Sequence, residues 1–321
     1  MVAIILVNYN GLNDTIKCIE SLLLSKYKDF CVIIVDNSDN DLSVNDISNR
    51  YNLKQQNINL FSSGISSVYV NSKNNIVLLS SCENRGFAAA NNQGILYLEK
   101  FYPNIEYFWL LNNDTIIEAD TLGQLVKTAE CSECNIGIIG TNLLFMDNPN
   151  LIQALGGKYN RCFASCMHVG AYVDKHRYKK ILKKARVDYV VGASMLVKKQ
   201  FVKTVGYMEE KYFLYFEELD WILRGKQYGF DFVIDYDAVV YHKEGGSTKA
   251  YSKLISEVAD KCQLRNRILF TKKFYPSCLF LVLCSTFLTI VKRFMSGHKN
   301  RSKVLLNVFC EEVKKICIRA K

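Results

Sequence analysis

The stretch Tyr107-Phe-Trp-Leu-Leu-Asn-Asn-Asp114 indicates the fold of this 321-residue chain. Five apolar residues in a row predict a strand that is buried on both faces, as in a parallel sheet. Polar residues at the carboxyl end of such a strand lie where open α/β sheets bind ligands. The carboxylate of Asp114, beside the amides of Asn112 and Asn113, suits a divalent cation that carries phosphates. An aspartate that merely ends a strand is the competing interpretation.

The chain begins with a predicted βαβ unit. Val2–Val7 and Cys31–Asp36 are short runs rich in β-branched residues, and Asn13-Asp14-Thr15 can cap a helix between them. The apolar face of that helix is Ile16, Ile19, Leu22 and Leu23. Such a unit is expected to be right-handed, with its two strands parallel.

Alternating strands and helices continue from there and indicate the α/β class. Further strands are predicted at Ile76–Leu79, Tyr107–Leu111, Ile136–Gly140, Val187–Val197 and Phe230–Tyr241. Helices are predicted at Gly86–Lys100, Ala119–Glu130 and Glu217–Tyr228. Residues 37–74 are rich in Asn and Ser and lack periodicity, so we expect a long surface insertion. We divide the chain into a domain over residues 1–245, with halves 1–115 and 116–245, and a helical region over 246–321.

Basic residues are concentrated in the last quarter of the chain. The formal net charge is +10. Residues 243–321 hold 17 Lys/Arg and five Asp/Glu, a net +12, whereas residues 1–242 hold 24 and 26, a net −2. A positive tail of this kind binds nucleic acid or anionic lipid, or keeps a protein soluble.

An apolar segment lies within this basic region. Residues 274–291 carry no charge and are flanked by Lys272 and Lys273 on one side and Lys292 and Arg293 on the other. Eighteen residues is the lower limit for a membrane span. We interpret the segment as interfacial, because the cations on both sides would face anionic lipid. A buried helix is the alternative. Met1 leads directly into a strand without a signal peptide, so we expect the cytosolic side.

Polar residues follow the first two strands, at the position of a nucleotide base and ribose in such sheets. They are Asn8, Tyr9 and Asn10 after the first strand, and Asp36 and Ser38 at the end of the second. Asp36 as a simple turn residue remains an alternative. Arg85 and Gly86 precede a helix start, whose free N–H groups suit anionic oxygens. Arg85 can bind phosphate, or it can be an exposed structural residue.

Two further features carry reactive groups. Glu217, Glu218 and Asp220 follow the aromatic run 212–216, where apolar surroundings can raise a carboxyl pKa toward that of a working base. Acidic residues that simply begin a helix are the alternative. His242 ends a strand, where a neutral imidazole is a good ligand for Mn²⁺ or Mg²⁺.

Seven motifs, in this order, resemble the inverting glycosyltransferases of family two, which have the GT-A fold. They are VNYNG, VDNS, NRGFAAANN, LLNNDT, VGASMLV, FLYFEELDWILR and HKEGGST. The resemblance covers about residues 2–275 and is strongest to bacterial rhamnosyltransferase-type enzymes that build O-antigen and capsule. It implies a Rossmann-like mixed sheet flanked by helices, with a C-terminal helical region that associates with the membrane.

The resemblance also implies roles for individual residues. Asp114 and His242 would hold Mg²⁺ or Mn²⁺, and Glu218 would be the base, with Glu217 and Asp220 as the other acidic candidates. The nucleotide would contact Asn8, Tyr9, Asn10, Asp36, Ser38, Arg85, Gly86, Asn112 and Asn113. Donor and acceptor sugars would contact Gly192, Ala193, Ser194 and Trp221.

The implied reaction transfers a sugar to a polyprenyl-diphosphate-linked saccharide at the cytoplasmic face of the membrane, where the protein would be peripheral. dTDP-rhamnose is the expected donor. A UDP-hexose donor and a non-catalytic scaffold with this fold are the alternatives. We expect an anionic membrane surface as a partner rather than nucleic acid, because the tail contains an apolar run and no RNA-reading aromatic motif. A homodimer is left open.

Overall fold

The computed structural model describes residues 1–58, 60, 64–73, 75–131, 135–182, 186–243 and 256–318. Two compact units are present. The first comprises Met1–Lys158, His168–Lys211 and Glu217–Ser247, and the second comprises Tyr159–Met167, Tyr212–Phe216 and Thr248–Lys321. The boundary that we expected at 245/246, within the Gly245-Gly246-Ser247 segment, lies outside the described residues.

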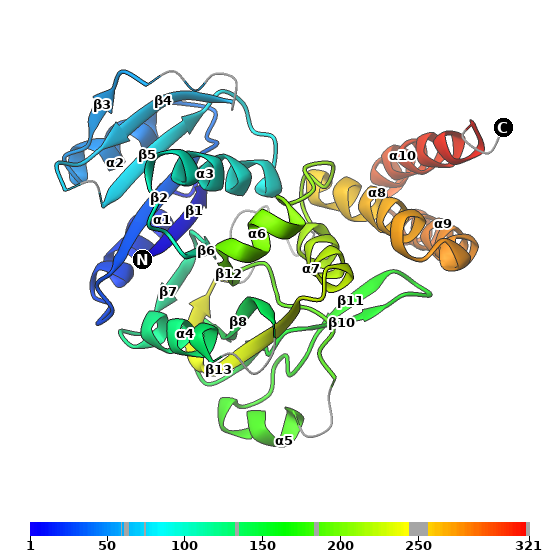
Figure 1. Cartoon of the computed structure of the whole chain (residues 1–321). Coiled ribbons are helices and arrows are strands. Elements are labelled where there is room, and N and C mark those ends of the chain that lie inside the picture. Colours follow the sequence, from blue (N-terminus) through cyan, green and yellow to red (C-terminus); the bar gives the residue numbers. More distant parts are fainter. Residues whose placement is uncertain are drawn as a thin grey trace. The chain divides into compact units, whose positions relative to one another are not determined.

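A mixed sheet forms the centre of the first unit (Figure 1). Its strands are β1 (Val2–Asn8), β2 (Phe30–Asp36), β3 (Lys54–Gln56), β4 (Ile65–Val70), β5 (Ile76–Ser81), β6 (Tyr107–Asn112), β7 (Thr115–Ile117), β8 (Ile136–Phe145), β9 (Ile152–Ala154), β12 (Ser194–Lys198) and β13 (Asp231–His242). The strand order is β3-β4-β5-β2-β1-β6-β12-β8-β13-β7, and β9 pairs with β8. β5, β2, β1 and β6 are parallel neighbours, whereas β12 is antiparallel to both β6 and β8.

Helices cover both faces of the sheet. They are α1 (Leu12–Leu23), α2 (Leu42–Arg50), α3 (Phe87–Phe101), α4 (Thr121–Glu130), α5 (Tyr178–Leu182), α6 (Lys199–Val205) and α7 (Glu217–Gln227), with a short 3₁₀ turn η2 (Lys175–Arg177). Ile4 and Leu6 of β1 pack with the buried faces of α1, α2 and α4. Ile5 points to the other face of the sheet. It lies against α3 there, since a Cβ added to Gly94 of α3 would be 2.9 Å from Ile5 Cγ2. The predicted α/β class and mixed sheet are confirmed.

Strand register brings the candidate site residues to one edge. Asn8 of β1 lies opposite Asp36 of β2, and Val7 lies opposite Asn112 of β6. Asp114 follows β6 by two residues and immediately precedes β7, whose first residue, Thr115, lies opposite His242 of β13. Because these strands end at the same level, residues from four distant parts of the sequence meet at one edge.

Three local predictions were wrong. Residues 37–74 are not an unstructured insertion, since α2, β3 and β4 lie there and β4 pairs antiparallel with β5. Only Ser194–Lys198 of the expected strand 187–197 forms a regular strand. Helix α1 begins without a side-chain cap, because Gly11 is its N-cap residue and Asp14 instead pairs with Lys243 at 2.9 Å.

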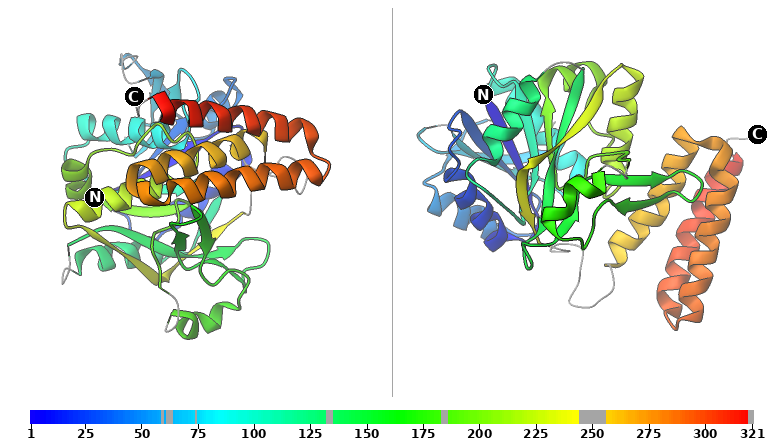
Figure 2. Two further views of the ribbon diagram at one scale, coloured as in Figure 1. Left: turned by 90° about the vertical axis from the view of Figure 1, so that its right-hand side faces the viewer. Right: turned by 90° about the horizontal axis from the view of Figure 1, so that it is seen from below.

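The second unit contains three helices that lie side by side (Figure 2). They are α8 (Glu257–Phe274), α9 (Leu279–Met295) and α10 (Lys299–Ile318), with the 3₁₀ turn η3 (Pro276–Cys278) between the first two. Their core is formed by Leu264, Ile268, Ile290 and Leu305. Arg293 of α9 and Arg301 of α10 both contact the buried carboxylate of Asp260 on α8. The charge-free segment 274–291 does not form one continuous helix, because α8 ends at Phe274 and the 3₁₀ turn η3 precedes α9.

The second unit also includes the chain just before α7. Tyr215 and Phe216 have positive φ angles of 72° and 76°, which side chains other than glycine rarely adopt. Buried Asn266 on α8 holds this turn, since its Nδ2 donates to the carbonyls of Leu214 (2.8 Å) and Tyr215 (3.0 Å). A separate two-stranded sheet is formed by β10 (Gly157–Asn160) and β11 (Ser165–His168).

Candidate active site

The carboxyl ends of β1 and β2 are joined by a buried polar network. Asn8 Nδ2 donates to Asp36 Oδ2 at 2.7 Å, and Asp36 also accepts from Ser43 Oγ at 2.6 Å and from the Ser38 amide at 2.8 Å. Ser38 Oγ accepts from the Asn10 amide at 3.0 Å. Asn8, Asp36 and Ser38, which we predicted to contact a nucleotide, therefore lie together.

The second amide of the NND motif extends this network inward. Asn113 Nδ2 donates to Asn8 Oδ1 (3.2 Å) and to Thr15 Oγ1 (2.8 Å), and Asn113 is buried. These bonds connect β1, α1 and the end of β6. The side-chain amides of Asn8 and Asn113 are therefore hydrogen-bonded to other protein groups. The more exposed side chains here are those of Asn10 and Tyr9, and the Tyr9 hydroxyl donates to Asp39 at 3.2 Å.

Asp114 and His242 lie side by side, as expected for ligands of one ion. His242 Nε2 is 3.1 Å from Asp114 Oδ1 and 3.2 Å from Asn112 Nδ2. His242 Nδ1 is 2.7 Å from Gln153 Oε1 on β9. The Asn112 Nδ2 group can only donate and the Gln153 oxygen can only accept, so Nε2 acts as acceptor and Nδ1 as donor in these two contacts.

Nε2 and the Asp114 carboxylate face each other at 3.1 Å, so an ion between them would take the Nε2 lone pair in place of the Asn112 amide. Nitrogen and carboxylate oxygen donors are suited to Mn²⁺, and a carboxylate with substrate phosphates is suited to Mg²⁺. The described residues contain no cluster of three or more His, Cys, Asp or Glu side chains that could hold a metal. The pair therefore fits an ion that takes its remaining ligands from a bound substrate.

Sequence reasoning missed two contributors to this corner. Gln153 was the only polar residue in the apolar run Leu151–Leu155, which could have drawn attention to it. Lys243 follows His242; its amide donates to the Asp114 carbonyl at 3.1 Å and its ammonium pairs with Asp14 at 2.9 Å. Nothing in the local sequence links Lys243 to Asp14, which lies 229 positions earlier.

Arg85 and Gly86 lie on the loop between β5 and α3. Gly86 has φ +93°, a conformation that favours glycine, and its amide donates to Asn84 Oδ1 at 3.0 Å. Asn84 Oδ1 also accepts from Asn37 Nδ2 at 3.4 Å, so this loop lies against the residue that follows Asp36. Arg85 Nη2 is 2.6 Å from Glu210 Oε2.

The three acidic residues of α7 have different surroundings. Glu217 is 4% exposed, and its Oε2 has no hydrogen-bond partner within the part of the chain that the structure describes. Burial raises the pKa of the Glu217 carboxyl well above its usual value, and the charge of Glu218 raises that pKa further. Glu218 is partly exposed and lies beside Gly192, where an added Cβ would be 3.9 Å from its Cδ.

Asp220, Trp221 and Ser194 were expected to touch substrate, and their burial argues against it. Asp220 is fully buried and paired at 2.7 Å with Arg224, which also donates to the carbonyls of Val205 and Tyr207. Trp221 is fully buried and its Nε1 donates to the Gly206 carbonyl at 2.8 Å. These contacts hold α7 on the loop after α6.

The VGAS segment likewise divides into exposed and buried parts. The Ser194 hydroxyl accepts from Trp109 Nε1 at 3.0 Å within the core. Ala193 is 5% exposed, and its carbonyl accepts from the Asn112 amide at 2.9 Å. Of the four residues expected to contact sugars, only Gly192 lies at a partly exposed position beside an acidic candidate.

Comparisons with known proteins identify a similar family and similar folds. Residues 3–152 match the family model of Glycosyl transferase family 2. The low-salt glycan biosynthesis hexosyltransferase Agl10 of Haloferax volcanii is 25% identical over 157 residues, which are 49% of this chain. The match spans about half (48%) of the length of that relative.

Solved structures resemble the whole chain more extensively. The mannosyltransferase PcManGT from Pyrobaculum calidifontis, in complex with GDP-Man and Mn²⁺, has a TM-score of 0.54 at 12% identity, covering 95% of this chain and 78% of that one. S. aureus TarS 1-349 in complex with UDP-GlcNAc has a TM-score of 0.56 at 13% identity, covering 97% and 81%. At these identities the likeness concerns the fold. Residues 3–152 thus resemble glycosyl transferase family 2, as the motifs indicated, and the chain has the GT-A fold.

Proposed function

We propose that this protein transfers a sugar from a nucleoside-diphosphate sugar to an acceptor hydroxyl, with inversion at the anomeric carbon. The observation that carries the proposal is the convergence of the Asn8–Asp36 network with the Asp114–His242 pair at one edge of the sheet. The first lies where a nucleoside binds in such sheets. The second fits an ion bound to a diphosphate.

Asp114 and His242 would hold the divalent ion, Mg²⁺ or Mn²⁺, and Gln153 would orient the imidazole. When bound, the ion supplies positive charge that stabilises the departing nucleoside diphosphate. Two of the similar solved structures, PcManGT and GalNAc-T7, are complexes with Mn²⁺. Asn10, Tyr9 and Gly86 are the residues near this edge whose backbone or exposed side chains would contact the nucleotide.

Glu218 would act as the general base. It accepts the proton of the acceptor hydroxyl while the hydroxyl oxygen forms a bond to the anomeric carbon. The bond from that carbon to the diphosphate oxygen breaks, and its electron pair leaves with the nucleoside diphosphate. Glu218 is preferred to Glu217 because a base must reach the acceptor, and Glu217 is almost completely buried. A protonated Glu217 beside it avoids two adjacent negative charges.

dTDP-rhamnose and a polyprenyl-diphosphate-linked saccharide in O-antigen or capsule synthesis are proposed from the motif resemblance alone. A UDP-hexose donor is the second candidate, favoured by the hexosyltransferase name of the Haloferax relative and by the UDP complexes among the similar structures. The Asp114–His242–Gln153 arrangement argues against a non-catalytic scaffold.

We also propose that the second unit contacts an anionic membrane surface, which would place the protein at the cytoplasmic face. Within the described chain, Pro276–Met295 is one segment long and apolar enough to cross a bilayer, with mean hydropathy 1.8 and 17% of that window buried. Exposed apolar residues recur two helical turns apart on α9, at Leu281, Leu288 and Met295 and at Phe280, Phe287 and Phe294. Opposite them Val282, Thr286 and Ile290 are buried, so we favour an interfacial helix over a span.

Replacing the base should separate catalysis from donor binding. With a panel of UDP- and dTDP-sugars and Mn²⁺, nucleoside diphosphate release identifies the donor for wild-type protein. Glu218→Gln is then expected to lower turnover by about 10²- to 10⁴-fold, the usual contribution of a general base, with nucleotide affinity unchanged by calorimetry. Exposed Glu130→Gln on α4 is the control. Full turnover in Glu218→Gln would reject the base assignment.

The contact between Gln153 and His242 should control metal affinity. Gln153→Leu is expected to weaken Mn²⁺ binding in the presence of UDP by about 10- to 100-fold, because the ring loses the acceptor that orients it. Gln153→Glu keeps an acceptor and should retain affinity. Electron paramagnetic resonance of free Mn²⁺ measures both. Equal affinities for the wild-type and Leu proteins would exclude an orienting role.

Buried Glu217 should make stability depend on pH. The folded protein keeps the proton to higher pH than the unfolded chain, whose carboxyl titrates near 4.5. The free energy of unfolding therefore falls as pH rises above that value. Glu217→Gln should be more stable than wild type in urea unfolding at pH 8, and the difference should vanish toward pH 4. A difference that is constant with pH would mean that Glu217 does not titrate in this way.

The exposed face of α9 should govern membrane binding. Wild-type protein is expected to co-sediment with vesicles containing about 30% anionic lipid and less with purely zwitterionic ones, since apolar burial and charge attraction add. Phe280→Asp with Leu288→Asp should abolish this binding. Leu24→Asp, at an equally exposed apolar position of the first unit, is the control. Co-sedimentation of the double variant at the wild-type level would refute the interfacial assignment.

A further inference from the structure

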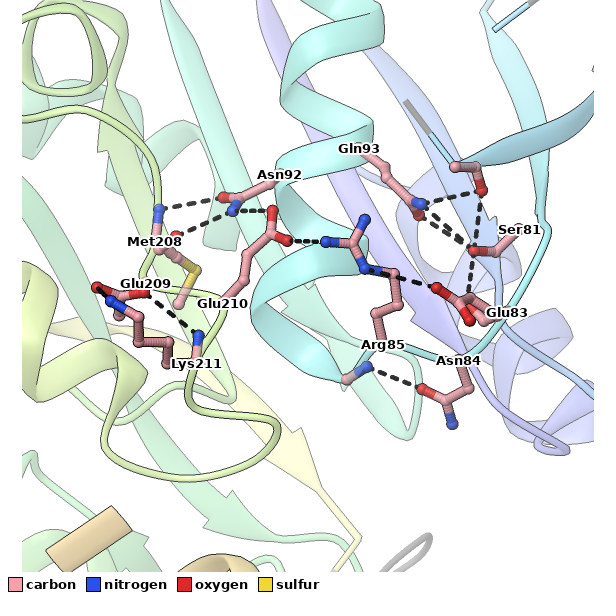
Figure 3. A network of polar contacts seen from close by, with 12 residues as sticks. Ser81, Glu83, Asn84, Arg85, Asn92, Gln93, Met208, Glu209, Glu210 and Lys211 are labelled. Atoms are coloured by element: carbon pink, nitrogen blue, oxygen red, sulfur yellow. Dashed lines mark hydrogen bonds and ion pairs between the residues drawn. The ribbon is translucent and has the colours of Figure 1, made fainter. Parts of the chain in front are cut away.

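A polar network joins the start of α3 to the loop that precedes the acidic helix (Figure 3). Arg85 Nη2 contacts Glu210 Oε2 at 2.6 Å, and the other oxygen of Glu210 accepts from Asn92 Nδ2 at 3.0 Å. Asn92 also bonds twice to the backbone of Met208, donating to its carbonyl at 3.0 Å and accepting from its amide at 3.1 Å. Glu210 thus connects an exposed arginine to a buried asparagine.

The buried end of this network is held by several hydrogen bonds. Asn92 is 2% exposed, and its three hydrogen bonds hold residues 208–210 against α3. The preceding residues of the same loop are held by α7, through Trp221 Nε1 to the Gly206 carbonyl and Arg224 to the Tyr207 carbonyl. Residues 206–210 therefore bridge α3 and the helix that carries Glu218.

The ion pairs at the exposed end of the network contribute less stabilisation. The side chains of Arg85 and Glu210 are 45% and 36% exposed, and Arg85 Nε is also 3.8 Å from Glu83. Ion pairs this exposed are screened by water and contribute little. Arg85 follows Asn84, which bonds to the residue after Asp36, so the backbone from which the arginine side chain extends lies near the edge proposed for the nucleotide. A diphosphate offers a guanidinium stronger, bidentate hydrogen bonds.

We propose that Glu210 is a positioning residue that competes with the donor diphosphate for Arg85. This inference rests on the proposed function and adds to it a coupling between the donor and the loop before α7. Without donor, Arg85 neutralises Glu210 and the loop 206–210 is held from both sides. With donor bound, Arg85 transfers its hydrogen bonds to the diphosphate, and Glu210 keeps only its bond to Asn92.

Glu210→Gln tests the competition without removing the loop contact, because the glutamine oxygen still accepts from Asn92. The variant should bind UDP or dTDP, with Mn²⁺, about two- to fivefold more tightly by calorimetry, the range expected for losing one exposed ion pair. Glu209→Gln removes the same charge from the adjacent residue, which pairs with Lys211 instead, and should leave affinity nearly unchanged. Arg85→Ala should weaken binding, and adding Glu210→Gln to it should restore nothing.

Hydrogen exchange provides the second readout. UDP should increase exchange of the 206–211 amides in wild-type protein, and these amides should exchange faster in Glu210→Gln even without UDP. Equal nucleotide affinities for wild type, Glu209→Gln and Glu210→Gln would overturn the competition while leaving the proposed function intact. A gain that persists in the Arg85→Ala background would also overturn it, because it would reflect net charge alone. Wild-type protein that binds neither nucleotide would reject the proposed function and this inference together.

Discussion

The in-register parallel pairing of β1 with β2 and β6 is the constraint on which the site depends. It sets Asn8 opposite Asp36 and Val7 opposite Asn112, so that three loops leave the sheet at one level. Side chains in a strand alternate between faces, and a shift of one residue would exchange them. The fully buried residues Ile4, Leu6, Ile34 and Trp109 oppose any such shift, because they pack against helices through one face only. The core thereby fixes the geometry of the polar edge.

The region around Asp114 and His242 depends on antiparallel strands added to the parallel part of the sheet. His242 reaches Asp114 because β13 runs beside both β7 and β8, and β9 adds Gln153 from the far side of β8. The Gln153 oxygen, 2.7 Å from Nδ1, fixes the orientation in which the ring presents Nε2 to Asp114. Asp114, the single carboxylate of the NND motif, thus lies beside His242, which contacts Gln153. The side-chain amides of Asn112 and Asn113 contact other residues of the protein, His242 and Asn8.

The acidic helix illustrates how one short sequence acquires several roles. Glu217, Glu218 and Asp220 follow one another on α7, yet one is buried and protonated to higher pH, one is partly exposed beside Gly192, and one is paired with Arg224. Rotation of about 100° per residue around the helix axis separates their surroundings. The strained turn at Tyr215 and Phe216 sets where that rotation begins, and Asn266 holds it within the second unit.

The sequence by itself determined the α/β class, most of the strands around Asn8 and Asp36, the resemblance to glycosyl transferase family 2, and the candidate pair of Asp114 and His242. These follow from short-range patterns: apolar runs end in polar residues, and motifs keep their order along the chain. It did not reveal the ordered elements within residues 37–74, where pairing of β4 with β5 overrides a weak local pattern. Only the tertiary structure showed that Trp221, Ser194 and Asp220 are buried, that Gln153 lies 2.7 Å from His242, and that Arg85 pairs with Glu210. Burial and pairing between residues 15 to 125 positions apart depend on how the sheet is assembled, which no local pattern records.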